Sequence, residues 1–211
     1  MFFQNVLLAS ALTLGAIAAP QPHKNHAGLL NTAKLVAIAP ATASCDGSEF
    51  PTECADATKA AAAINQSFSK YNITSVGERA ALVAYMLFES GDFKYSHNHF
   101  PAPGRPGQGT RIMAMPAIIA EYATAVVGAH AVTAAQAQGP DAVLALVNSD
   151  DNKSFGTAAW FLTTKCTADV RAGLVAETTD GWYNFLTECV QTTLDPARDV
   201  PWTTAKQIMH E

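Results

Sequence analysis

The chain has 211 residues, a formal net charge of -5 and a hydrophobic content of 49%. This size fits one domain with a full core. The acidic balance argues against nucleic acid and anionic bacterial surfaces as electrostatic partners, because both favour an excess of Lys and Arg.

The first residues predict a secretory signal peptide over residues 1–18. An uncharged run from Val6 to Ala19 contains the small-residue pattern Ala16-Ile17-Ala18, which is typical of a cleavage site. The run is too short for a membrane span of about 20 residues, and no other segment of the sequence predicts one. We therefore expect a secreted, extracellular protein.

Cysteines and glycosylation sequons agree with this compartment. Four cysteines most simply form two disulfides, with three possible connectivities. We favour Cys45 with Cys54 and Cys166 with Cys189, because short loops close easily. Asn-x-Ser/Thr sequons occur at Asn65, Asn72 and Asn152.

The hydrophobic pattern predicts a mainly helical domain. Residues 19–44 show no sustained amphipathic period and are expected to form a flexible leader or propeptide, so the folded domain is placed at residues 45–211. Helical spacing of apolar residues predicts helices over residues 55–70, 76–89, from Pro116 onward, 140–148, 154–165, 167–176 and 180–192. There is no run of alternating strands and no internal repeat.

The second of these helices ends in a carboxylate, Glu89. Ser75 and Glu78 form a capping-box pattern at its start, and an apolar run leads to its end. The negative end of the helix dipole and the loss of hydration both favour the protonated form of a carboxyl there. Glu89 is therefore a candidate general acid; the structural alternative is a helix-terminal carboxylate paired with Arg105 or Arg111.

The residues after Glu89 resemble a known family. Glu89-Ser90, the aromatic Phe93, the turn Gly107-Gln108-Gly109 and the stretch Ile112–Ala117 with its Met-Pro are similar to lytic transglycosylases and goose-type lysozymes, over residues 82–122. The resemblance implies a lysozyme-like helical domain with a long active-site loop, and it matches Glu89 to the catalytic acid. The family's glycine falls on Thr110.

The predicted loop over residues 94–111 holds three prolines, three glycines and two histidines, and long loops in compact domains are often functional. The family's glutamine falls on Met113, so Gln108 can supply that amide only by a shift in loop geometry. The substrate-binding candidates are Phe93, Tyr95, His97, His99, Gln108, Arg111 and Met113. Phe100 and Trp160 are further aromatic rings that can stack on sugars, although helical position favours Trp160 as a core residue.

A hydrolytic glycosidase normally needs a second carboxylate, whereas a transglycosylase of the family it resembles does not. Asp92 is the first candidate because it lies close to Glu89; the others are Glu121, Asp150 and Asp151. Asp150 and Asp151 are better suited to cap or precede the helix that starts near Ser154. His97 and His99 with Glu89 or Asp92 would make a zinc shell, but no further ligand spacing supports it, so we expect no metal and no cofactor.

Two functions follow from these patterns. The first is a secreted, monomeric enzyme that cleaves β-1,4-linked aminosugar polymers of the peptidoglycan or chitin type, with Glu89 as general acid. The second is a non-catalytic secreted carbohydrate-binding protein or effector on the same scaffold. The chain has no Gly-x-Ser-x-Gly motif and its cysteines are expected to be paired, so serine and cysteine nucleophiles have no support.

Overall fold

The computed structural model describes residues 29–211; the predicted signal peptide lies outside the described residues. Within this range the chain is mainly helical, as predicted, with ten α-helices and two isolated β-bridges but no strand. No helix in this range is long and apolar enough to cross a bilayer.

The elements follow one another in a single series. They are α1 (Thr32–Ile38), the short helix η1 (Pro40–Ala43), α2 (Ala57–Lys70), α3 (Val76–Glu89), α4 (Pro116–Val127), α5 (Ala129–Gln136), α6 (Pro140–Asn148), α7 (Asp151–Lys165), α8 (Ala168–Val175), α9 (Thr179–Asn184), the π-helical segment η2 (Phe185–Val190) and α10 (Pro196–His210).

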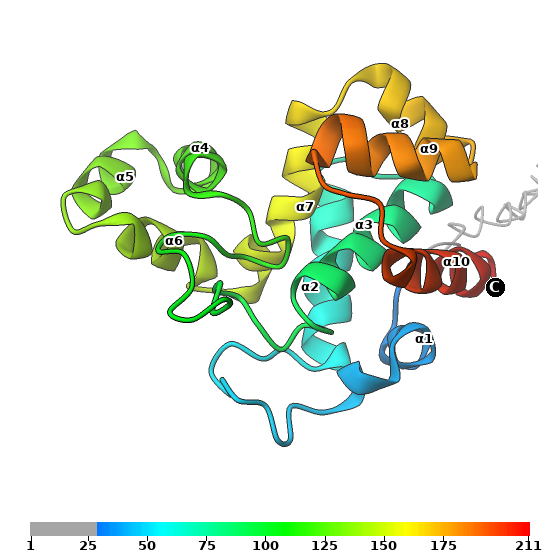
Figure 1. The fold of residues 1–211 in the computed structure, drawn as a ribbon, viewed down its shortest axis with the longest axis horizontal. Coiled ribbons are helices and arrows are strands. Elements are labelled where there is room, and N and C mark those ends of the chain that lie inside the picture. The colour runs from blue at the N-terminus through cyan, green and yellow to red at the C-terminus, as the bar shows by residue number, and fades with distance from the viewer. Residues whose placement is uncertain (1–28) are drawn as a thin grey trace, which may run out of the picture.

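The helices are arranged around α3 and α7 (Figure 1). Helices α4, α5 and α6 gather on one side of α7, while α8, α9 and α10 lie on the other side. Helix α3 packs mainly against α10, and α2 packs against α7. Because α3 is buried along nearly its whole length, from Gly77 to Leu87, its final residue, Glu89, emerges where the two groups of helices meet.

Local capping explains why three of the predicted helices begin where they do. The Ser75 hydroxyl accepts the backbone N–H of Glu78 at 3.2 Å, which satisfies one of the free donors at the start of α3. Pro116 is the first residue of α4, where its missing N–H costs nothing. Asp150 caps α7 through the N–H of Lys153, so its carboxylate has a structural use.

The prediction of a flexible leader up to residue 44 is wrong for its second half. Helix α1 begins after Asn31, whose side chain accepts the N–H of Lys34 at 2.8 Å, and it buries Leu35 completely. This helix packs against α2 and α10. It spans only seven residues, too few for an amphipathic period to stand out in the sequence. The folded unit therefore includes residues well before Cys45.

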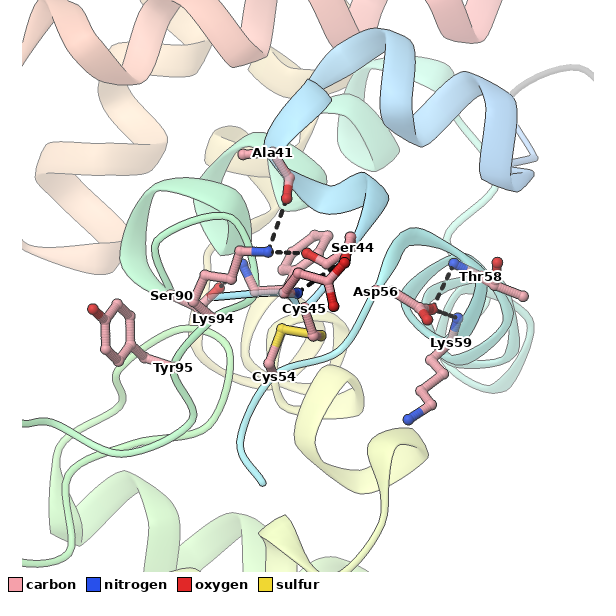
Figure 2. Close-up of a disulfide and its surroundings, with 12 residues drawn as sticks. Ala41, Ser44, Cys45, Cys54, Asp56, Thr58, Lys59, Ser90, Lys94 and Tyr95 are labelled. Atoms are coloured by element: carbon pink, nitrogen blue, oxygen red, sulfur yellow. Dashed lines mark hydrogen bonds between the residues drawn. A yellow bond between two sulfur atoms is a disulfide. The ribbon is translucent and has the colours of Figure 1, made fainter. Parts of the chain in front are cut away.

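The two disulfides are those that the short loops favour, Cys45–Cys54 and Cys166–Cys189. They fit a protein made in an oxidising compartment. Figure 2 shows that the first disulfide lies beside a second tie, in which the Lys94 ammonium donates to the carbonyls of Ala41 and Ser44. Lys94 thereby fastens the segment after α3 to η1 and to the residue that follows η1.

Helices α5 and α10 were not predicted. Helix α10 carries Pro201 in its interior, which argues against a helix when the sequence is read alone. Its packing compensates: Trp202 stacks on Trp182 with ring centroids 5.5 Å apart, and the Trp182 indole donates to Asp199 at 2.8 Å. These contacts fix the position of α10 against the rest of the protein.

Truncation of Leu35 tests whether α1 belongs to the folded unit. Leu35→Ala should lower the free energy of unfolding by about 2–5 kcal/mol, because it empties a fully buried site. Chemical denaturation measures this loss, and Lys34→Ala on the same helix, which removes no buried side chain, serves as the control. A loss for Leu35→Ala no larger than that of the control would show that α1 adds nothing to stability.

The three sequons should differ in glycan occupancy. The Asn65 amide nitrogen, where a glycan would attach, donates to the Leu30 carbonyl at 2.7 Å, and its oxygen accepts the Leu30 N–H at 3.0 Å. Asn72 and Asn152 are exposed. Glycopeptide mass spectrometry of protein secreted from a eukaryotic host should find glycans at Asn72 and Asn152 and an unmodified Asn65; a fully glycosylated Asn65 in folded protein would contradict this.

Candidate functional site

A groove of about 530 Å³ lies beside the end of α3. Tyr85 and Glu89 come from α3, and Gln108 and residues 112–115 come from the segment that precedes α4. The remaining lining comes from Ile118 of α4, Phe161 and Lys165 of α7, and residues 188–192 at the end of η2. Both groups of helices thus contribute walls, and Glu89 lies between them.

The Glu89 side chain is 19% exposed and is held by Arg198 of α10. The Arg198 Nη1 donates to Glu89 Oε1 at 2.6 Å. Among residues 29–211 no other hydrogen bond to the Glu89 carboxyl is seen, and the residue lines the groove. The structural alternative of an ion pair is therefore real, but the partner is Arg198 rather than Arg105 or Arg111.

Two opposing effects act on the Glu89 carboxyl. Burial raises its pKa above the usual value, because the charged form loses hydration, while the hydrogen bond and the positive charge of Arg198 act to lower it. The net direction is upward. The neighbouring Tyr85 is buried and donates to the Ile112 carbonyl at 3.3 Å; burial, with the charge of Glu89, raises the pKa of this phenol. A carboxyl with a raised pKa beside an open groove can give a proton to a ligand.

The segment between α3 and α4 keeps its shape without regular structure. Bridges join Gly109 to His97 and to Ala114, and a side chain at Gly109 would meet the Ser96 carbonyl at 2.3 Å. The glycine therefore permits a close approach between two parts of this segment. Gln108 faces the groove and donates to the Met113 carbonyl at 2.9 Å, so both of these predicted substrate residues do line the groove.

Two of the predicted substrate contacts are structural instead. Phe93 is fully buried and packs edge-on against Phe155 with ring centroids 5.1 Å apart. Arg111 is also buried and donates to the carbonyls of Phe93 and Tyr95 at 3.0 and 3.1 Å. A buried ring or guanidinium cannot contact a sugar in the groove. The prediction failed because residues 91–93 all have positive φ, which turns Phe93 into the core.

Tyr95, His97 and His99 gather near Glu53, and none of the three lines the groove. His99 Nε2 lies 2.8 Å from Glu53 Oε1, and His97 Nδ1 lies 3.3 Å from it. The Phe50 ring stacks on His99 at 3.6 Å, and Phe100 lies edge-on to Tyr95. The histidines thus have Glu53 as their carboxylate partner, not Glu89 or Asp92. No group of His, Cys, Asp and Glu side chains in the described part of the chain could hold a metal ion.

The predicted second carboxylates lie outside the groove. Asp92 lines a separate depression between η1, α3 and α10, where burial raises its pKa. Glu121 pairs with Lys165, and Asp151 lies 3.6 Å from Arg111. The carboxylate that does line the groove with Glu89 is Glu188 of η2. Sequence reasoning missed it because nothing in the local pattern relates η2 to α3.

Trp160, which was considered as a ring that could stack on sugars, is buried and contacts Tyr122, so it is a core residue.

Comparison with known proteins finds one partial match to this chain. The chain is 38% identical over 151 residues to a bifunctional dioxygenase–epoxy alcohol synthase of Fusarium oxysporum; the match covers 67% of this chain and 11% of that protein. The chain thus spans about a tenth of the length of that relative. No protein-family model matches the sequence, and no solved structure matches the fold.

The Glu53 carboxyl should make the free energy of unfolding depend on pH. Burial would raise its pKa, but hydrogen bonds from His97, His99 and two backbone N–H groups lower it from 4.5 to about 2. A carboxyl whose pKa is lower in the folded state than in the unfolded state stabilises the fold at pH values above the unfolded-state pKa. This stabilisation is lost as the pH falls from about 4.5 to about 2. Glu53→Gln should therefore lose on the order of 2 kcal/mol at pH 6 and much less at pH 2.5.

Urea unfolding at a series of pH values measures this difference. Glu49→Gln changes an exposed carboxylate on the same segment and should have little effect at either pH. An equal loss for Glu53→Gln at pH 6 and at pH 2.5 would contradict the assignment.

Proposed function

We propose that this protein is a secreted, lysozyme-like enzyme that cleaves β-1,4-linked aminosugar polymers of the peptidoglycan or chitin type, with Glu89 as the general acid. The observation that carries the proposal is the position of Glu89: a partly buried carboxyl with a raised pKa, at the end of a buried helix and on the wall of an open groove. In the reaction Glu89 would protonate the glycosidic oxygen as the bond to the anomeric carbon breaks.

The surroundings of Glu89 support the lysozyme-like assignment. The helix end at Glu89, part of the irregular segment over residues 90–115 and Ile118 in the first turn of α4 border the same groove. Thr110 stands where the family has glycine, and its φ of 61° lies in the left-handed region that favours glycine. The backbone at Thr110 thus has the left-handed conformation that suits the family's glycine, although the residue here is a threonine.

The groove itself suits a polar chain. Gln108, Gln191 and Thr192 supply hydrogen-bonding groups, while Met113, Ile118 and Phe161 supply apolar surface, the mixture that a carbohydrate requires. Glu188 adds a second carboxylate to the lining, which is the group that a hydrolytic mechanism would use to activate water.

The alternative is a non-catalytic secreted protein that binds glycans in the same groove. The ion pair between Glu89 and Arg198 at 2.6 Å favours it, because a neighbouring cation stabilises the carboxylate over the acid. Met113 in the place of the family's glutamine supports it further. The likeness to the Fusarium relative covers 11% of that protein, which is too little to carry its dioxygenase and epoxy alcohol synthase activities over to this chain.

Replacement of Glu89 separates the two functions. Glu89→Gln should reduce cleavage of chitooligosaccharides or bacterial cell walls by at least about 100-fold, the usual contribution of a general acid, with little change in glycan affinity. Reducing-end release with mass spectrometry of the products measures cleavage, and calorimetry measures binding.

Glu49→Gln is the control, because Glu49 is an exposed glutamate that does not line the groove. Full cleavage by Glu89→Gln would end the enzymatic proposal. Glycan binding by the wild-type protein without cleavage of any of several polymers would establish the binding function instead.

A further inference from the structure

Arg198 makes more contacts with the groove than an ion pair requires. Its Nη1 donates to Glu89 Oε1 at 2.6 Å, and its Nη2 donates to the hydroxyl of Thr192 at 3.2 Å. Thr192 itself lines the groove. The guanidinium also lies over the Phe88 ring, 3.9 Å from its centroid, and the residue is only 7% exposed. One buried cation thus joins the end of α3 to the wall that follows η2.

The position of Arg198 is set by its own helix. Its backbone N–H donates to Asp195 at 2.9 Å in the first turn of α10, and the stacked Trp202 and Trp182 hold that helix one turn further on. The Thr192 backbone N–H donates to the Leu186 carbonyl at 2.9 Å. Both ends of the link are therefore fixed before any ligand enters the groove.

We propose that Arg198 is a positioning residue for Glu89: it holds the carboxyl by Oε1, leaves Oε2 for the ligand and ties the carboxyl to the wall formed by Thr192. The proposal rests on the function proposed above, because positioning matters only if Glu89 acts on a ligand. Arg198 itself is not assigned a contact with substrate.

The charge of Arg198 has a second effect, on the proton of Glu89. The ionisable groups beside Glu89 are Tyr85 on its own helix and Arg198 on α10, and Lys165 and Glu188 line the same groove. Arg198 is the one in hydrogen-bond contact, so it favours the ionised form most strongly. Loss of this contact should raise the pKa of Glu89, and in an enzyme the alkaline limb of the pH profile should move to higher pH.

The titration of Glu89 in the full-length protein tests the coupling without requiring activity. Carboxyl ¹³C NMR of protein labelled at glutamate, with the Glu89 signal assigned by its loss in Glu89→Gln, gives the pKa directly. Arg198→Gln should raise it. Arg198→Lys, which keeps the charge but has a single nitrogen in place of Nη1 and Nη2, and Thr192→Val, which removes the hydroxyl partner of Nη2, should raise it less. Arg171→Gln breaks the comparable pair with Glu78 at 2.8 Å and should leave Glu89 unchanged.

Unchanged titration of Glu89 in folded Arg198→Gln would overturn the proposal. If that variant does not fold, an unchanged titration in both Arg198→Lys and Thr192→Val would overturn it. A raised Glu89 pKa in a protein that cleaves no glycan would support the coupling and refute the proposed enzyme. Cleavage of glycans by the wild type, with an unchanged Glu89 titration in every variant, would support the proposed enzyme and refute the coupling.

Discussion

The ion pair between Arg198 and Glu89 is the interaction on which the arrangement of this protein depends. A buried charge without a partner is costly, and removal of one member of such a pair typically costs about 3–5 kcal/mol. The pair spans 109 residues of sequence and joins α10 to α3, the two helices with the most extensive contact in the described part of the chain. Because Arg198 also reaches Thr192, the same link shapes the groove.

The segment between α3 and α4 shows the same use of charge. Within this segment Arg111 donates to two backbone carbonyls and Lys94 donates to two carbonyls near the first disulfide, while Glu53 accepts two backbone N–H groups of the segment. Backbone polar groups that no helix or sheet satisfies are thus paired with buried or half-buried ions. Because its backbone polar groups are paired in this way, a groove wall can be rigid without regular secondary structure.

Local signals predicted much of the fold and little of the site. Helices with clear caps, such as α3 after Ser75 and α4 at Pro116, were predicted with their observed starts. Helix α10 was missed because Pro201 masks a helix that tertiary packing stabilises. Glu89 could be singled out from its place in one helix, whereas its partner Arg198 comes from a distant one. The histidine pair was recognised, but Glu53, the carboxylate that holds it, lies more than 40 residues away in sequence.

The central claim is that Glu89 meets a glycosidic bond in the groove. A crystal structure of Glu89→Gln with a β-1,4-linked N-acetylglucosamine oligosaccharide tests it most directly. The sugar chain should lie in the groove, with a glycosidic oxygen about 3 Å from the side chain of residue 89. An oligosaccharide bound instead on the exposed Phe100 ring and its neighbour Tyr95, with the groove empty, would contradict the assignment of Glu89 as the acid.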